Sequence, residues 1–245
     1  MKLTLAETKL LKESVSIISE LVSEVRFDVT KNALELVAMD PANVAMVIYK
    51  LFSSAFVEYS VKGKESLCIN LNEFKQVLRR VKSADTLTLS TDDNKLLITL
   101  KSTSKREFAL PLIDLEAREQ KVPDLNFSAS VTTTGEIFAD AIEDVDIIGE
   151  SVMLATDKKS FFISSSSDLS KANVEVPADN NTKIEADEKV SAKYSIEYLK
   201  KMVAGSKLTD EVTVRFSKDY PLQLEYVLVD KMVLKFILAP RVDND

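Results

Sequence analysis

The sequence predicts an α+β protein with two similar domains, each containing two helices and antiparallel β-sheets. Apolar side chains at helical spacing alternate along the 245 residues with shorter apolar runs that have the spacing of strands. Both halves of the chain follow the order helix, strands, helix, strands, at an offset of about 125 residues. Glu73-Phe74 and Glu197-Tyr198 occupy matching places in this repeat. An internal duplication is the simplest explanation.

The first half is expected to contain amphipathic helices at residues 7–25 and 72–81. Each has apolar residues every three or four positions and lysine, arginine or serine on the opposite face. The remaining apolar runs are separated by turn sequences such as Asp40-Pro41-Ala42-Asn43, which indicates strands joined by turns. The strands are expected at residues 25–29, 33–39, 44–51, 66–71, 86–90, 96–101 and 106–112.

The second half repeats this order, with helices expected at residues 135–148 and 195–204. Asp157-Lys158-Lys159 stands where the first half has Thr30-Lys31-Asn32, and both read as turns between strands. The strands are expected at residues 127–133, 152–156, 160–165, 172–176, 189–194, 212–216, 222–229 and 232–239.

The middle of the chain combines an expected edge strand with a charged connector. Phe108, Leu110 and Leu112 share one face of an extended segment. Pro111 cannot donate a ladder hydrogen bond, which favours a position at the edge of a sheet, where another chain could pair. The following charged stretch ends at Val122-Pro123 and reads as a linker. We therefore expect a first domain over residues 1–113, a connecting loop over 114–125 and a second domain over 126–245.

The composition removes several classes of function. The chain has no histidine, which is the commonest general base and transition-metal ligand, and its four glycines are not spaced as a phosphate-binding loop. A single cysteine, Cys68, allows no intrachain disulfide. No apolar stretch is long enough for a signal peptide or a membrane span, so a cytosolic protein is expected. The net charge of -7 leaves room only for local basic patches.

One enzymatic alternative stays open on the residues alone. A metal-dependent nuclease could use the paired acids Asp92 and Asp93, or the acids Asp140, Glu143 and Asp144. Acidic pairs in turns are more often solvated turn residues, so this is the weaker interpretation.

Four short motifs together indicate a family. They are Met39-Asp40-Pro41 after a strand, residues 108–114 (FALPLID), residues 220–226 (YPLQLEY) and the terminal residues 238–242 (LAPRV). In this combination the chain resembles the sliding clamps of the proliferating cell nuclear antigen family, and most closely the archaeal members. The resemblance covers the whole chain.

The resemblance implies a protein that is not an enzyme and needs no cofactor or metal. Three two-domain subunits of such a clamp close into a ring around duplex DNA, with the helices inside and the sheets outside. The ring tethers partners, which are expected to be the clamp loader and, through short glutamine-aliphatic-aromatic motifs, DNA polymerase, flap endonuclease and ligase. An archaeal member would be cytoplasmic and nucleoid-associated, and a eukaryotic one nuclear. A clamp-like checkpoint or accessory subunit is the alternative, and the ring could contain one kind of subunit or several paralogues.

The resemblance also assigns residues to three surfaces. Subunits are expected to pair through residues 105–112 and 169–176, with side chains from Phe108, Leu110, Leu112, Asn173, Val174 and Val176. A partner-peptide pocket is expected from Met39, Asn43, Val44, Val122, Pro221, Leu222, Ala239 and Pro240. The position of Asn43 is histidine in eukaryotic members. The DNA-facing residues are expected to be Lys9, Lys12, Lys75, Arg79, Arg80, Lys82, Lys200, Lys201 and Lys207.

A ring that slides needs attraction to phosphates without contacts to base edges, and lysine and arginine on helix surfaces meet that need. The expected third helix differs from the other three. Residues 135–148 contain no lysine or arginine, and their polar side chains are mostly acidic, namely Glu136, Asp140, Glu143, Asp144 and Asp146. We expect DNA contact from the other three helices, unless these acids pair with lysines of their own domain.

Overall fold

The computed structural model describes residues 1–115 and 120–241, and the chain divides into two compact units. The first comprises Met1–Pro41, Val47–Val122 and Leu228–Leu234, and the second comprises Ala42–Met46, Pro123–Val227 and Lys235–Asp245. Val242 of the terminal motif and residues 116–119 of the expected connector lie outside the described residues. No helix in the described part is long and apolar enough to span a membrane.

The first unit has two α-helices, α1 (Lys9–Ile18) and α2 (Leu71–Leu78), and a 3-10 turn, η1 (Ser53–Ala55). Five strands form a sheet in the order β5-β1-β7-β8-β9, and β4-β3-β2-β6 are neighbours in another. The strands are β1 (Lys2–Leu5), β2 (Glu24–Val29), β3 (Ala33–Met39), β4 (Ala45–Phe52), β5 (Glu58–Ser60), β6 (Glu65–Asn70), β7 (Thr86–Asp92), β8 (Lys95–Lys101) and β9 (Lys105–Pro111).

The second unit has α3 (Gly135–Asp146), α4 (Ile196–Met202) and the 3-10 turn η2 (Val203–Lys207). Strands β14-β10-β16-β17-β18 are neighbours in one sheet, and β13-β12-β11-β15 form a separate sheet of four strands. The strands are β10 (Ala129–Thr134), β11 (Ser151–Thr156), β12 (Ser160–Ser166), β13 (Lys171–Pro177), β14 (Lys183–Ala186), β15 (Val190–Ser195), β16 (Glu211–Phe216), β17 (Leu222–Leu228) and β18 (Met232–Leu238).

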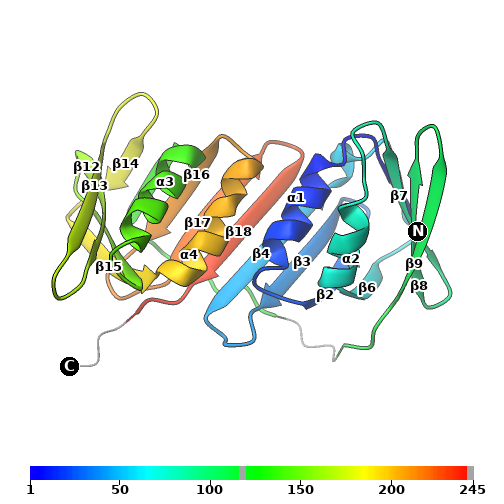
Figure 1. Cartoon of the computed structure of the whole chain (residues 1–245), viewed down its shortest axis with the longest axis horizontal. Coiled ribbons are helices and arrows are strands. Elements are labelled where there is room, and N and C mark those ends of the chain that lie inside the picture. The colour runs from blue at the N-terminus through cyan, green and yellow to red at the C-terminus, as the bar shows by residue number, and fades with distance from the viewer. Residues whose placement is uncertain (116–119, 242–245) are drawn as a thin grey trace. The chain divides into compact units, whose positions relative to one another are not determined.

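In each unit the two helices lie side by side on one face of the sheets. Figure 1 shows α1 beside α2, and α3 beside α4, and within each unit the two turned views keep the helices on one side of the strands. Burial alternates along the strands, as in β16, where Val212, Val214 and Phe216 are fully buried. Burying such side chains contributes about 1.5 to 3 kcal/mol each. The predicted α+β fold of two similar domains is confirmed.

Local chemistry sets the ends of the helices. The Asn70 side chain accepts hydrogen bonds from the amides of Asn72 and Glu73, which caps the N-terminus of α2. Gly205 in η2 lies against the ring of Tyr226, where an added Cβ would approach ring atoms to 2.4 Å. A glycine at this position therefore permits the close packing of η2 on β17.

The expected helix at residues 7–25 was wrong in length, because α1 ends at Ile18. The Ser19 hydroxyl donates to the Ser16 carbonyl, and the amides of Glu20 and Leu21 make three-residue turns. Residues from Glu24 onward pair with β6 instead, so tertiary strand pairing overrides the helical pattern. The short strands β1, β5 and β14 were also missed, because three or four residues give too little periodicity to detect.

The expected edge strand is confirmed. β9 is the last strand of its sheet and pairs only with β8, including Pro111 opposite Lys95, among the residues that the structure describes. β13 is likewise the last strand of its four-stranded sheet and pairs with β12. β5, β6, β14 and β15 also end their sheets, so β9 and β13 are two of several strands that have one edge without a pairing partner within the described residues.

Candidate functional site

The helix face of the first unit carries most of its predicted DNA-facing residues at the surface. Lys9 is exposed on α1 and Lys12 is half-buried. Arg79, Arg80 and Lys82 are exposed and follow the last turn of α2. These three side chains form a small group of cations at the C-terminal end of a helix, where the helix dipole favours positive charge.

Lys75 is less available than the sequence indicated. Its ammonium group lies 2.6 Å from a carboxylate oxygen of Glu20, and the side chain is only 13% exposed. Sequence spacing places Lys75 on the polar face of α2, but it does not show that the turn after α1 brings Glu20 alongside. A direct contact of Lys75 with phosphate would require this ion pair to open.

In the second unit the predicted cations are also partly neutralised. Lys200 lies 2.6 Å from Asp146 at the end of α3, and the hydrogen bond and charge of Asp146 raise the pKa of Lys200. Lys201 pairs with Glu197 at 2.9 Å and lies over the Tyr198 ring. Lys207 is exposed. One of the acids of α3 is thus balanced by a lysine of its own unit.

The other acids of α3 remain at the surface. Glu136, Asp140, Glu143 and Asp144 are all exposed. They lie on the polar face, opposite the buried Phe138, Ala141, Ile142 and Val145. The accessible surface of α3 is therefore acidic, as predicted. Asp146 is the acid of this helix that pairs with Lys200.

A buried ion pair joins β9 to the segment after α2. The Arg106 guanidinium pairs with Asp85 and donates to the Arg80 carbonyl at 2.9 Å. Asp85 also accepts hydrogen bonds from the Lys82 amide and the Ser102 hydroxyl, both at 2.7 Å. The Lys82 amide, then the Ser102 hydroxyl and Arg106, lower the pKa of Asp85 to about 2. Sequence reasoning missed this network, because no spacing rule links residues 80–85 to a strand beginning at Lys105.

The predicted subunit residues lie on the two edge strands or directly beside them. Phe108, Leu110 and Val174 are half-exposed, whereas Asn173 is exposed and Val176 is buried. Leu112 lies just beyond β9, and its amide donates to the Asn94 carbonyl. Leu169, in the turn before β13, is 96% exposed. The edges therefore combine free backbone groups with accessible apolar side chains.

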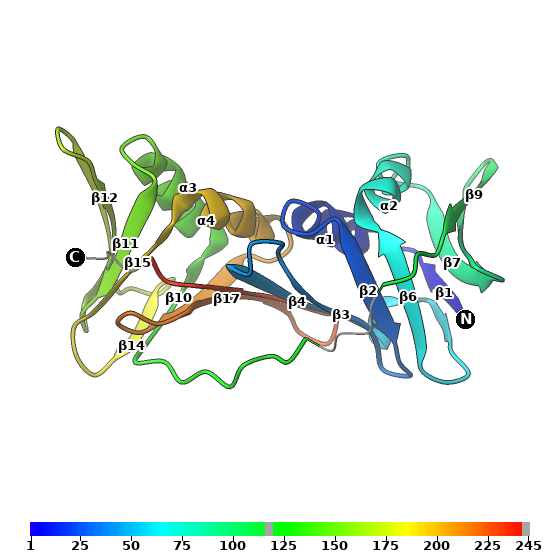
Figure 2. The same cartoon turned by 90° about the horizontal axis from the view of Figure 1, so that it is seen from below.

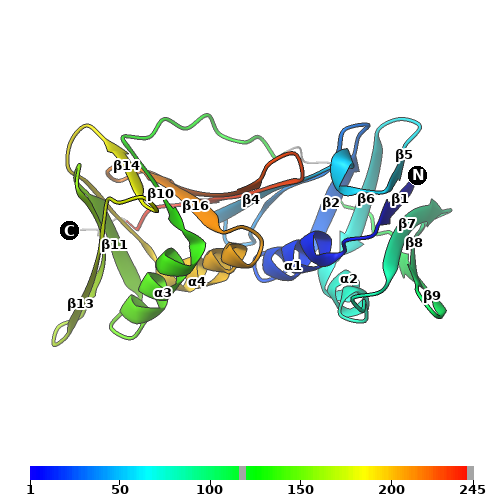
Figure 3. The same cartoon turned by 90° about the horizontal axis from the view of Figure 1, so that it is seen from above.

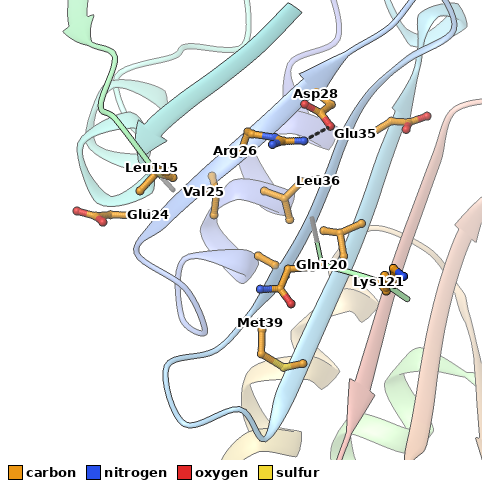
Figure 4. Close-up of a pocket in the computed structure, with 12 residues that line it drawn as sticks. Glu24, Val25, Arg26, Asp28, Glu35, Leu36, Met39, Leu115, Gln120 and Lys121 are labelled. Carbon is orange, nitrogen blue, oxygen red and sulfur yellow. Dashed lines mark hydrogen bonds and ion pairs between the residues drawn. The ribbon is translucent and has the colours of Figure 1, made fainter. Parts of the chain in front are cut away.

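A groove of about 430 Å³ lies in the first unit between the connector and strands β2 and β3. Leu115, Gln120 and Lys121 line it from the connector, and Met39 lies at the end of β3 (Figure 4). Arg26 and Asp28 of β2 form an ion pair of 3.0 Å in its wall. The sequence identified Met39 but missed the polar wall, although Glu24, Arg26 and Asp28 alternate with buried residues and so share the outer face of β2.

The other predicted pocket residues differ in exposure. Val122 is 48% exposed, Asn43 is exposed with a positive φ of 56°, and Val44, Pro221, Ala239 and Pro240 are partly exposed. The Ala239 amide donates to the Val44 carbonyl at 2.9 Å, which brings the start of β4 beside the end of β18. Leu222 must be corrected, because it is fully buried with Leu224 and Tyr226 on the core face of β17.

The acids of the nuclease alternative lie in a turn, at Asp92 and Asp93, and on the exposed face of α3, at Asp140, Glu143 and Asp144. Asp92 ends β7 opposite Lys95, and Asp93 adopts a positive φ of 46° in the turn between β7 and β8. Across residues 1–115 and 120–241, no group of three or more acidic, cysteine or histidine side chains is arranged to hold a metal ion.

Two similar units, each with paired helices on one face and with an edge strand (β9 or β13) open to pairing, define a two-domain clamp fold. The N-terminal domain model of proliferating cell nuclear antigen matches residues 1–120, and the C-terminal domain model matches residues 121–241. The chain belongs to the proliferating cell nuclear antigen family.

Named relatives and a solved structure agree with this assignment. The chain is 36% identical over 229 residues to the DNA polymerase sliding clamps of Thermococcus gammatolerans and Pyrococcus horikoshii, covering 92% of this chain and 92% of each relative. It is 34% identical over 249 residues to the DNA polymerase sliding clamp of Nanoarchaeum equitans, covering 99% and 100%. A crystal structure of PCNA from Thermococcus kodakaraensis matches the fold with a TM-score of 0.92 at 24% identity, over 98% of this chain and 99% of that one.

Proposed function

We propose that this chain is a DNA polymerase sliding clamp subunit, three of which form a ring around duplex DNA and tether replication and repair proteins. One observation carries the proposal: this family member has an edge strand in each unit, β9 in the first and β13 in the second, whose outer edge has no pairing partner within the described residues. Two such edges in different units of one chain are suited to head-to-tail pairing between subunits, and head-to-tail contacts that close produce a ring.

The proposed contact with DNA uses charge alone. Lys9, Arg79, Arg80 and Lys82 in the first unit and Lys207 in the second are exposed on or beside the helices. Lys12, Lys75, Lys200 and Lys201 are weaker candidates, because they are half-buried or ion-paired. Backbone phosphates attract such side chains without regard to sequence, so the ring can move along the duplex.

The proposed partner residues come from both units: the connector groove with Met39 and Val122 in the first, and Val44, Ala239 and Pro240 in the second. Partners are expected to insert aromatic side chains of a short glutamine-aliphatic-aromatic motif, and Met39, Val44, Val122, Ala239 and Pro240 offer partly exposed apolar surface for them. DNA polymerase, the clamp loader, flap endonuclease and ligase are the expected partners. In this proposal the protein has no catalytic role, and residues 114–125 connect domains spanning 1–113 and 126–245.

The exposed acids of α3 favour a second version of the same proposal, in which paralogous subunits share a mixed ring. Glu136, Asp140, Glu143 and Asp144 would repel phosphate. Either the DNA lies off-centre in a ring of identical subunits, or other subunits supply the missing positive charge. An accessory clamp subunit in such a ring is the remaining alternative.

Reversing charges on the helices tests the proposed DNA face. Lys9→Glu with Arg79→Glu should weaken DNA retention and reduce the salt-dependence slope by about two units, since each phosphate contact contributes about one. Asp140→Lys with Glu143→Lys should strengthen retention and steepen the slope. Retention is measured by fluorescence anisotropy of a labelled duplex across a salt series.

The control is Lys31→Glu with Lys158→Glu, which makes the same charge change at exposed turn lysines away from the helices. This control should change the salt-dependence slope by less than half as much as Lys9→Glu with Arg79→Glu does. Such a small change is expected when only the net charge of the protein acts, over a long distance. Equal responses of the control and the first pair would show that the wrong surface has been assigned to DNA.

A further inference from the structure

We propose that Arg106 is a positioning residue, which through Asp85 makes the subunit edge strand β9 and the basic segment after α2 into one rigid element. The inference rests on the proposed function, since it assigns β9 to subunit pairing and the basic segment to DNA. It adds that the two activities are mechanically coupled within one subunit. Here the basic segment means residues 79–82, which contribute the exposed cations Arg79, Arg80 and Lys82.

The contacts of Arg106 connect two segments that are distant in sequence. Arg106 belongs to β9 and stands opposite Leu100 of β8. Its guanidinium is largely withdrawn from solvent, at 24% side-chain exposure, although the strand lies at a sheet edge. One terminal nitrogen donates to the carbonyl of Arg80 at 2.9 Å, and the other pairs with Asp85. The planar fork of arginine offers a separate terminal nitrogen to each acceptor, whereas a lysine has only one nitrogen for both.

Asp85 extends the connection to the backbone of the basic segment. Its side chain is completely buried and accepts the Lys82 amide at 2.7 Å and the Ser102 hydroxyl at 2.7 Å. The network therefore holds the carbonyl of Arg80 and the amide of Lys82, which are main-chain atoms of two of the three cationic residues. The direction in which these side chains leave the backbone depends on it.

The network is better suited to fixing the local geometry than to raising the free energy of unfolding. A buried ion pair contributes little net stability compared with apolar residues of the same size, because desolvation offsets the attraction. Such a pair does impose a defined arrangement, since any displacement leaves a buried charge without its partner. Pairing of β9 with a neighbouring subunit would thus restrict Arg106, and with it residues 80–82, so that ring closure orders the cations that meet DNA.

The test compares Arg106→Lys and Arg106→Gln with a matched variant, Arg215→Gln. Arg215 also pairs with a carboxylate, that of Glu225, at 2.9 Å and is 31% exposed, but it lies on β16 in the second unit and its partner lies on β17. Subunit association is measured by sedimentation equilibrium, and DNA retention by the salt series at concentrations where the ring is assembled. Hydrogen exchange is followed separately for the amides of residues 80–85 and 105–111, in the ring and in a monomeric background.

Both Arg106 variants should weaken subunit association by about fivefold or more, within the usual range for coupled sites. They should also speed hydrogen exchange in both residues 80–85 and residues 105–111, and lower the salt slope of DNA retention. Arg215→Gln should leave association, exchange and salt slope within twofold of the parent values. Arg106→Lys is decisive, because it keeps the charge beside Asp85 and loses only the second arm of the fork.

Parent-like association and exchange in Arg106→Lys would overturn the inference, as would a loss no greater than that of Arg215→Gln. So would faster exchange confined to one of the two segments. Failure of the proposed function looks different: the parent itself would neither assemble nor retain DNA. The exchange comparison in the monomer would still report whether Arg106 couples the two segments.

Discussion

Leu110→Glu should convert the assembled protein into monomers. Leu110 is half-exposed on β9, the strand whose outer edge is proposed to pair with β13 of the next subunit. A carboxylate there would have to lose its hydration on assembly, and burying a charge without a partner is strongly unfavourable. Light scattering after gel filtration should give a mass of 27.3 kDa for the variant and three times that value for the parent ring.

The matched control is Val57→Glu. Val57 is a 68% exposed apolar residue of the same unit that lies on neither β9 nor β13, so this variant should keep the parental mass. If the chain assembles only with paralogues, the same comparison applies to the mixed sample. A Leu110→Glu protein that elutes and scatters as the parent does would show that β9 is not the subunit contact.

Met39→Ala combined with Pro240→Ala should weaken binding of a glutamine-aliphatic-aromatic peptide by about tenfold or more. Both side chains are partly exposed at the ends of apolar strands, and the variant removes surface on which aromatic anchors are proposed to rest. A tenfold loss corresponds to about 1.4 kcal/mol, which is below the value of burying one full apolar side chain, about 1.5 to 3 kcal/mol. Titration calorimetry with a synthetic peptide provides the measurement.

Met153→Ala is the control for this pair. Met153 is also a methionine at the surface, with 37% exposure, but it lies on β11. This strand belongs to a different sheet from β18, the strand that precedes Pro240. The Met153→Ala variant should bind the peptide with the same affinity as the parent. Undiminished affinity in the Met39 and Pro240 variant would remove these residues from the partner site.

The fold was predictable where local chemistry and periodicity agree. Pro111 placed β9 at a sheet edge because proline lacks a donor, and the structure confirms that position. The bounds of β3 at Ala33 and Met39 were predicted because an apolar run lies there between two turn sequences. By contrast, the C-terminal part of the expected first helix became β2, since pairing with β6 decided the conformation of residues that had helical spacing.

The candidate surfaces were less predictable because side-chain partners come from distant segments. The pairs Lys75–Glu20 and Lys200–Asp146 join residues more than fifty positions apart, so spacing on one helix could not reveal them. Leu222 is a different case. Its alternation with Leu224 and Tyr226 already indicated a shared face, and that face turned out to be the core.

The central claim is that the protein encircles DNA, and threading onto end-blocked DNA tests it most directly. A linear duplex carrying biotin at both ends is incubated with the protein, and streptavidin is added either before or after the protein. A closed ring can thread only through an open end, so the account predicts stable retention in high salt when the ends are blocked afterwards, and none when they are blocked first. Equal retention in the two orders would contradict encirclement and indicate ordinary binding to the side of the duplex.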